Sequence, residues 1–196
     1  MTAIDFYYDF RSPFAYFATR RMGLLLDKGA RIRWRPVSVS VLLNLQVDEA
    51  PWAEREDPLC PPKRAHFMAD IFRLIEYWKI PFAMPSPPIP VCDEAMAIAA
   101  LLEREGISRS GFHDAVFEAV WQEQEDAADP EVLRACLAAG SHDPALQEAA
   151  SREGLDLLTA KTRAAYDQGV FGVPTFVVGD DLYFGADRME MLAARL

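Results

Sequence analysis

The stretch "YYDFRSPFAYFA" (residues 7–18) reads as the end of an apolar strand that continues directly into a helix. Pro13 suits the first turn of a helix, because the N–H that proline lacks is not needed there. Ser12 then becomes the N-cap, with its hydroxyl beside unpaired backbone N–H groups and the positive end of the helix dipole. Such a position favours an anion. Ser12 therefore either caps the helix only or also holds a negatively charged group that takes part in chemistry.

Regular structure is predicted on both sides of this junction. The aromatic and β-favouring residues 3–10 predict a buried strand. Apolar residues at helical spacing predict one helix from Pro13 to about Lys28, ended by Gly29. The period-two alternation of "RIRWRPV" (31–37) predicts a second strand. A strand, a helix and a parallel strand of this length form a right-handed βαβ unit.

The middle of the chain is predicted to be helical outside its proline-containing stretches. Residues 41–62 and the proline-rich residues 80–90 are expected to be irregular. The predicted helices are an amphipathic one from Phe67 to Trp78, two over 93–106 and 110–125, two that begin at Asp129-Pro130 and Asp143-Pro144, and a last one that ends near Gln168 at Gly169.

The last third of the sequence returns to β patterning. "PTFVV" (174–178) and "LYF" (182–184) flank Gly179-Asp180-Asp181, which is typical of a hairpin. The D-x-x-E spacing of Asp187 and Glu190 predicts a capping box that opens a short final helix.

The order of these elements, βαβ, helices and then ββα, decides the fold class. Strands come first and last, so both ends must share one sheet, and this is the thioredoxin order. We therefore expect an α/β, thioredoxin-like fold with a large all-helical insertion. Residues 1–40 plus 165–196 would form the thioredoxin-like domain, and residues 41–164 the helical insertion domain.

Composition excludes several classes of protein. A formal net charge of −10 argues against nucleic-acid binding, which needs clustered Lys and Arg. No signal peptide is recognisable, and no apolar run approaches the roughly 18 residues that span a bilayer. The three cysteines, Cys60, Cys92 and Cys136, predict neither a disulfide framework nor a metal site with the histidines. We expect a cytoplasmic protein without a metal and without membrane contact.

In a thioredoxin-like fold the reactive group lies where the first helix begins. Here that position reads Ser12-Pro13-Phe14-Ala15, so a redox dithiol is absent. No base lies near Ser12 in sequence to make it a nucleophile. Its hydroxyl is better suited to donate a hydrogen bond to the thiolate of a cosubstrate. Such a bond contributes about 1.5–3 kcal/mol and the helix terminus about 0.3–1, enough to ionise a thiol at neutral pH. The alternative is an ordinary N-cap.

"GVFGVPTF" (169–176) contains a second candidate site element. In this fold a cis-proline directly before the third strand faces the reactive position. Pro174 is placed to be that proline, which frees the N–H and C=O of Val173 to pair with a peptide-like ligand. The alternative is a trans proline that begins a strand.

Three motifs together resemble a known family. "DFYYDFRSPFAYFA", "VFGVPTFVV" and "FGADRMEML" are similar to the kappa-class glutathione transferases and the bacterial 2-hydroxychromene-2-carboxylate isomerases. Both groups are glutathione-dependent and belong to the DsbA-like thioredoxin superfamily. In the middle of the chain, "PPKRAHFMADIFRLIEYWKIPF" resembles the start of the family's lysine-containing helix.

The resemblance assigns roles to five residues. Ser12 matches the catalytic serine that hydrogen-bonds the glutathione sulfur. Val173 matches the residue whose backbone binds the cysteinyl part, ahead of the cis-proline. Ala186 and Asp187 match the pair that binds the γ-glutamyl end. Lys63 matches a lysine expected to meet a ligand carboxylate, with Arg11 or Arg64 as possible helpers. The alternatives are a capping role for Asp187 and a solvated helix start for Lys63.

The insertion departs from the family pattern. Ala53 and Glu54 stand where the family often has an asparagine, and Asn44 is too distant to replace it. His66 and Phe67 also differ from the usual aromatic residue and methionine. These changes concern the substrate more than glutathione. Cys60 lies between prolines near Lys63. It is either a reactive thiol or, as the simpler interpretation, a buried and inert cysteine.

The function that this resemblance implies is a glutathione-dependent isomerase acting on an aromatic-pathway carboxylate. Its partners would be glutathione, a small aromatic carboxylate and a second copy of the chain in a homodimer. The alternatives are a kappa-like glutathione transferase or peroxidase, which would consume free thiol, and a non-catalytic thioredoxin-fold binding protein. A thiol-disulfide oxidoreductase that uses Cys60 is a further alternative.

Overall fold

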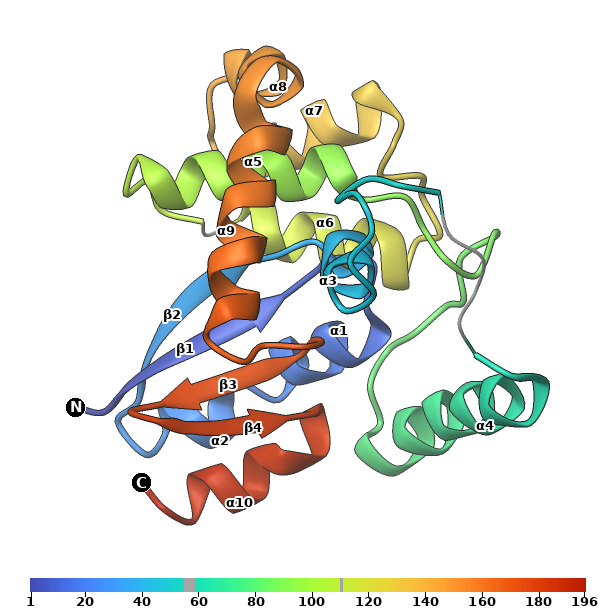
Figure 1. Ribbon diagram of the computed structural model, residues 1–196, viewed down its shortest axis with the longest axis vertical. Helices are drawn as coiled ribbons and strands as arrows, with labels where there is room; N and C mark the ends of the chain where they lie inside the picture. Colours follow the sequence, from blue (N-terminus) through green and yellow to red (C-terminus); the bar gives the residue numbers. More distant parts are fainter. Residues whose placement is uncertain (55–58, 110) are drawn as a thin grey trace.

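A four-stranded sheet in the order β2–β1–β3–β4 forms the centre of the computed structural model, which describes residues 1–54, 59–109 and 111–196 (Figure 1). β1 (Ala3–Tyr8) and β2 (Arg31–Pro36) are parallel, with Phe6 opposite Trp34. β3 (Thr175–Val178) is antiparallel to β1 and to β4 (Asp181–Phe184). Both ends of the chain thus contribute to one sheet, and the thioredoxin-like fold is confirmed.

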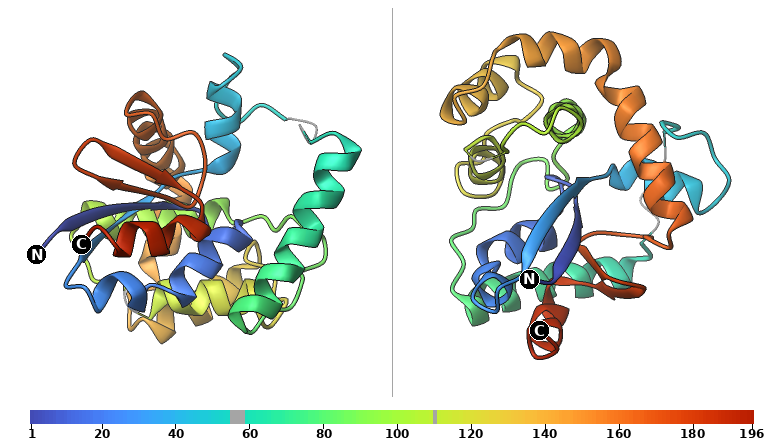
Figure 2. Two further views of the ribbon diagram at one scale, coloured as in Figure 1. Left: turned by 90° about the horizontal axis from the view of Figure 1, so that it is seen from below. Right: turned by 90° about the vertical axis from the view of Figure 1, so that its left-hand side faces the viewer.

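Helices cover both faces of the sheet. α1 and α2 lie on one side, and α3 and α9 on the other (Figure 2). The helices are α1 (Pro13–Arg20), α2 (Gly23–Leu26), α3 (Val39–Leu45), α4 (Pro61–Trp78), α5 (Asp93–Arg104), α6 (Phe112–Trp121), α7 (Pro130–Ala139), α8 (Ala145–Ala149), η1 (Ala150–Gly154), α9 (Leu155–Asp167), η2 (Ala186–Arg188) and α10 (Met189–Ala193).

Aromatic rings of the central strand form the middle of the core. Phe6 lies fully buried between Phe176 of β3 and Trp34 of β2, with ring centroids 4.9 Å from each. Tyr8 packs on Trp34 and hydrogen-bonds His113 of α6. Because β1 is covered on both faces, its sequence is almost continuously apolar rather than alternating.

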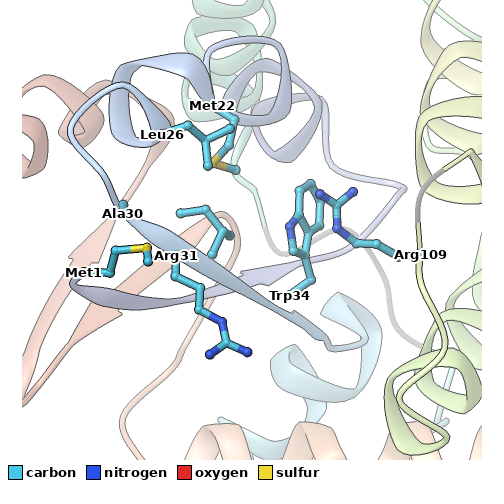
Figure 3. A pocket seen from close by; sticks show the side chains of 8 residues that line it. Met1, Met22, Leu26, Ala30, Arg31, Trp34 and Arg109 are labelled. Atoms are coloured by element: carbon cyan, nitrogen blue, oxygen red, sulfur yellow. The ribbon is translucent and has the colours of Figure 1, made fainter.

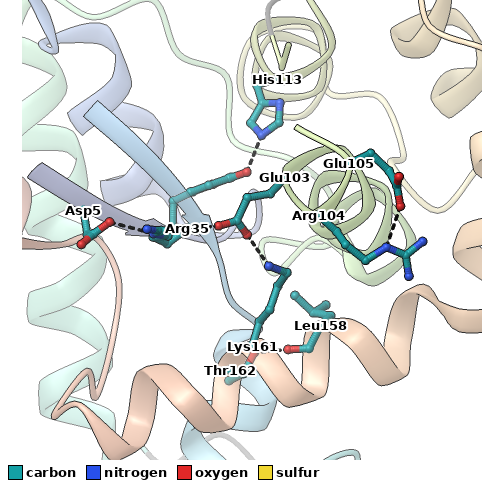
Figure 4. Close-up of polar contacts among 10 residues, drawn as sticks. Asp5, Arg35, Glu103, Arg104, Glu105, His113, Leu158, Lys161 and Thr162 are labelled. Carbon is teal, nitrogen blue, oxygen red and sulfur yellow. Dashed lines mark hydrogen bonds and ion pairs between the residues drawn. The ribbon is translucent and has the colours of Figure 1, made fainter. Parts of the chain in front are cut away.

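An ionic network joins the sheet to the helices (Figure 4). Arg35 on β2 contacts Asp5 of β1 at 2.7 Å and Glu103 of α5 at 2.5 Å. Glu103 also accepts a bond from Lys161 of α9 at 2.6 Å. Residues from four elements therefore share one half-buried group of alternating charges.

The structure corrects two of the predicted elements. The single helix expected from Pro13 to Lys28 is two helices, because the chain turns at Arg21–Met22 with i→i+3 hydrogen bonds and restarts at Gly23, a weak helix former. The prediction that residues 41–62 are irregular is also wrong at the start of this stretch, because α3 extends to Leu45. Ser38 caps this helix by accepting a bond from Val41 N–H.

Most of the other predictions of secondary structure are confirmed within a few residues, but the helix expected from Asp143-Pro144 and the last one ending near Gln168 run on without a break as α8, η1 and α9. α4 begins at Pro61, earlier than the apolar pattern indicated, and residues 80–90 form no helix or strand. Asp129 is the N-cap of α7, and the hairpin of β3 and β4 forms as expected. Gly169 has φ +93°, a backbone conformation that ends α9 and that glycine adopts without strain.

Candidate active site

Ser12 is the N-cap of α1. Its backbone is extended (φ −93°, ψ 116°), and its Oγ accepts a hydrogen bond from Ala15 N–H at 3.2 Å. The side chain is at the edge of the solvent, with 9% of the residue exposed. Within the described residues, the hydroxyl hydrogen has no acceptor. Capping and donation to a ligand are therefore compatible, since the first uses a lone pair and the second uses the hydrogen.

The Val173–Pro174 peptide bond lies at the same end of the sheet. Tyr7 pairs with Thr175, so the antiparallel register brings residues 173–174 level with the chain that leaves β1 toward Ser12. The bond is cis, as the sequence predicted. In the described part of the chain, neither the N–H nor the C=O of Val173 is hydrogen-bonded. An extended ligand can pair with this free backbone as an added strand.

The turn that contains Ala186 and Asp187 is tied to both of these elements. Gly185 N–H donates to the Pro174 carbonyl at 2.9 Å, and Arg21 at the end of α1 donates to the Ala186 carbonyl at 2.9 Å. Asp187 lies in the turn of η2 and its side chain is 57% exposed.

The predicted capping box of the final helix is wrong. α10 begins at Met189 and has no side-chain cap, and Glu190 pairs with Arg21 instead of reaching back along the chain. The extra η2 turn shifts the helix start past Asp187. The Asp187 carboxylate is left with a weak contact to Arg188 at 3.5 Å, so it is accessible to a ligand.

Lys63 lies at the beginning of α4. The ring of Phe67, four residues later and on the same face of the helix, contacts Phe14 two residues after Ser12. At the other end of α4, Trp78 contacts Phe17 and stacks under the guanidinium of Arg21, whose Cζ lies 3.9 Å from the ring centroid. α4 therefore runs beside α1 in the same direction, with exposed Lys63 at the end nearest the start of α1.

Asp9 was not predicted as part of the site. It is 1% exposed, and burial raises the pKa of its carboxyl to about 6. Its Oδ1 accepts from Arg11 N–H at 3.0 Å and its Oδ2 from Val39 N–H at 2.8 Å. The signal in the sequence was an acid enclosed by aromatic residues, three positions before the helix cap.

Arg11, one of the two arginines considered for a substrate carboxylate, is already engaged. Its guanidinium donates to the Ser40 hydroxyl and lies near Asp9 and Asp93. The side chain of Arg64, the second, donates to the Leu59 carbonyl at 3.4 Å. Asn44 uses its amide to hold the carbonyls of Ala50, Pro51 and Ala53, which makes it a structural residue of that loop.

The three cysteines are free, and they lie outside the first turn of α1. Cys60 is exposed at the N-cap of α4, so the expectation that it is buried is wrong. Cys92 and Cys136 are buried, and burial raises the pKa of both thiols.

Among the described residues, no group of three His, Cys, Asp or Glu side chains is arranged to hold a metal ion. Those residues also include no helix long and apolar enough to cross a membrane. A cavity of about 310 Å³ lies at the outer side of β2, where Arg109 stacks on Trp34 with Cζ 3.5 Å from the ring centroid (Figure 3). Its lining includes Met22, Leu26 and Arg31 but none of the predicted site residues.

Comparison with known proteins identifies the family to which this fold belongs. The sequence profile of the DSBA-like thioredoxin domain matches residues 3–196. The chain belongs to the DsbA-like thioredoxin family.

Two enzymes with the same name are similar to this chain. The 2-hydroxychromene-2-carboxylate isomerase of Sphingobium xenophagum is 31% identical over 196 residues, which cover 98% of this chain and 97% of that enzyme. The isomerase of Pseudomonas putida is 28% identical over 200 residues, covering 98% of this chain and 93% of that enzyme.

A solved structure of a 2-hydroxychromene-2-carboxylate isomerase also has this fold, with a TM-score of 0.79 and 25% identity over 98% of this chain and 93% of that one. In this chain, Ser12 and Ala15 lie at the start of α1 and neither carries a thiol, so this turn holds no redox dithiol.

Proposed function

We propose that this protein is a glutathione-dependent isomerase that acts on a small aromatic carboxylate of the 2-hydroxychromene-2-carboxylate type. The observation that carries the proposal is the Ser12 hydroxyl, which caps α1 with a lone pair and keeps its hydrogen for a ligand at the helix N-terminus. The two relatives at 31% and 28% identity, both named as isomerases of this type, support the same reaction class.

The residues around Ser12 fit glutathione. The Ser12 hydroxyl would donate to the sulfur, and the free N–H and C=O of Val173 beside cis-Pro174 would pair with the cysteinyl backbone. The Ala186–Asp187 turn would hold the γ-glutamyl end, where the Asp187 carboxylate suits an α-ammonium group. When bound, glutathione supplies a thiolate that adds reversibly to a conjugated carbon, so that the adjacent bond loses its double-bond character and can rotate.

Lys63 is the residue that we assign to the substrate carboxylate. It lies at the end of α4 next to the start of α1, and Phe67 on the same face brings an aromatic ring to this entrance. Arg11 is held by Ser40 and compensates Asp9, which leaves Lys63 the better placed cation. Lys63 would neutralise the carboxylate and orient the ring system above the sulfur position.

We further propose that the protein forms a homodimer in a reducing, cytoplasmic compartment. α4 exposes Phe72 and Tyr77, by 55% and 79%, and a second copy of the chain would cover such an apolar surface. Three free thiols suit a reducing compartment.

The test is to offer 2-hydroxychromene-2-carboxylate with and without glutathione and to follow its absorbance, while free thiol is titrated in parallel. We expect conversion only with glutathione, and no loss of free thiol. Conversion without glutathione would refute the cofactor assignment. Stoichiometric loss of thiol would identify a transferase instead.

A further inference from the structure

The carboxylate of Asp9 connects the loop that leads to Ser12 with the start of α3. Oδ1 accepts the N–H of Arg11 in the loop that leads into α1, and Oδ2 accepts the N–H of Val39 at the first position of α3. The main-chain carbonyl of Asp9 in turn accepts the N–H of Ser12 at 3.1 Å. One residue therefore provides a bond to Ser12 itself, a bond to its predecessor and an anchor on a separate helix.

Making these bonds with a buried carboxylate costs free energy. Charged carboxylates are rarely enclosed without a strong reason, because burial removes their hydration. The charged and titratable groups that face Asp9 are Arg11 on its own loop, Tyr8 at the end of β1, and Cys92 and Asp93 at the start of α5. Arg11 and the two N–H donors favour the ionised form, whereas burial and Asp93 oppose it. Such a costly group is typical of a functional requirement.

The bonds of Asp9 determine where the Ser12 hydroxyl can lie. Ser12 is an N-cap, so its position depends on the backbone of residues 9–12, which is not part of α1. Other bonds also hold this loop: Met96 Sδ accepts from Phe10 N–H at 3.3 Å, Trp121 Nε1 donates to the Phe10 carbonyl at 2.8 Å, and Arg11 donates to Ser40. The Val39 bond is the one that joins the Asp9 carboxylate to the backbone of α3. The carboxylate has two acceptor oxygens at a fixed separation and can hold both N–H groups, which an amide cannot, because its NH₂ would face a donor.

We propose that Asp9 is a positioning residue of the active site: its carboxylate ties the loop of Ser12 to the first turn of α3 and so fixes the hydroxyl that faces the sulfur of the cosubstrate. This inference rests on the proposed role of Ser12. It extends the site to Val39, whose contribution is a backbone N–H.

The chain offers a substitution that removes one of these bonds and leaves Asp9 in place. Val39 is the first residue of α3, a position that accepts proline, and Ser38 before it is extended (φ −93°, ψ 122°) as a residue before proline must be. Val39→Pro deletes the N–H that Oδ2 accepts. Val39→Ala also loses the valine side chain but keeps the N–H, and is the matched control. Asp9→Asn is the second test variant.

The first measurement is amide hydrogen exchange of Arg11 and Ser12 in the protein without glutathione. We expect both amides to exchange about tenfold faster in Val39→Pro than in Val39→Ala, which is the effect of about one hydrogen bond. Asp9→Asn should act like Val39→Pro. Equal exchange in Val39→Pro and Val39→Ala would overturn the inference, whether or not glutathione is the cosubstrate.

The second measurement is the ultraviolet absorbance of the thiolate when glutathione is added at increasing pH. In Val39→Pro and Asp9→Asn the bound thiol should ionise at higher pH than in Val39→Ala, with kcat reduced about tenfold. Unchanged ionisation and kcat, despite faster exchange, would show that Asp9 holds the loop without serving the reaction. A wild-type protein that binds no glutathione would refute the proposed function, and the exchange experiment would still decide whether Asp9 positions Ser12.

Discussion

The rings of Phe14 and Phe67 meet almost edge to face, with centroids 5.0 Å apart and planes at 70°. Phe14 is the second residue of α1, and Phe67 lies in the second turn of α4. Ile71 of α4 is buried, and Met68, Leu74, Ile75 and Trp78 pack partly buried against the core, so the Phe14–Phe67 contact adds an anchor near the start of the helix. This aromatic pair holds the end of α4 that carries Lys63 beside the end of α1 that carries Ser12.

Lys63→Gln should raise the KM for the aromatic carboxylate about tenfold, the value of one charge-assisted hydrogen bond, and change the affinity for glutathione much less. Lys79→Gln removes the same charge at the opposite end of α4 and is the matched control. Steady-state kinetics with each substrate varied in turn separate the two effects. Equal KM values in both variants would show that Lys63 does not meet the carboxylate.

Ser12→Ala should keep the fold and lose most turnover. Loss of an N-cap costs about 1 kcal/mol of stability. Asp129→Ala removes the N-cap of α7, which is also followed by a proline, and should be destabilised similarly with unchanged kcat. Thermal unfolding and kcat, measured on both variants, decide the role of Ser12. If the two lose the same small fraction of activity, the hydroxyl acts only as a cap.

Asp187→Asn should weaken glutathione binding about tenfold or more, because it removes the charge that faces the α-ammonium group. Fold stability should not change, since α10 does not use Asp187 as a cap. Asp180→Asn, in the exposed turn between β3 and β4, controls for the lost charge. Isothermal titration with glutathione measures both, and an affinity equal to that of Asp180→Asn would remove Asp187 from the site.

The sequence predicted the sheet and the Ser12 cap because both depend on local patterns. Aromatic runs mark buried strands, and a serine before a proline marks a helix start. Asp9 escaped prediction because its partner Val39 is thirty residues away, and nothing local shows that the two loops meet. The capping box of Asp187 and Glu190 was predicted wrongly for a similar reason: the η2 turn that displaces the helix start is held by Arg21 from α1.

Asp9 should make the protein less stable as the pH rises from about 4 to about 6. Burial raises the pKa of its carboxyl to about 6 in the folded state, so the folded protein binds more protons than the unfolded chain in this window. Unfolding free energy should therefore fall with rising pH, by an amount on the order of 2–3 kcal/mol. The Asp9→Asn variant should lack this component. Denaturant unfolding of the wild-type protein and of Asp9→Asn at several pH values measures this component. The prediction is contradicted if the free energy of unfolding depends on pH in the same way in both proteins.

Glu103→Gln should destabilise the protein by about 1–2 kcal/mol, because Arg35 and Lys161 both lose the negative charge of a half-buried carboxylate with which they pair. Glu153→Gln breaks the ion pair with Arg104 on the exposed surface and should leave the midpoint of unfolding unchanged. Urea unfolding of the two variants makes the comparison. Equal midpoints would show that the Arg35–Glu103–Lys161 group contributes no more than a surface pair.

The order of the sheet also shapes how the protein is made. β1 lies between β2 and β3, but β3 begins at Thr175, after the whole helical segment. At about 5–20 residues per second, the ribosome takes roughly 7–30 s to deliver that second neighbour. During this time one edge of an aromatic strand stays open on the nascent chain, a state that invites aggregation. A chaperone that covers residues 3–8 during synthesis should therefore reduce aggregation of the nascent chain.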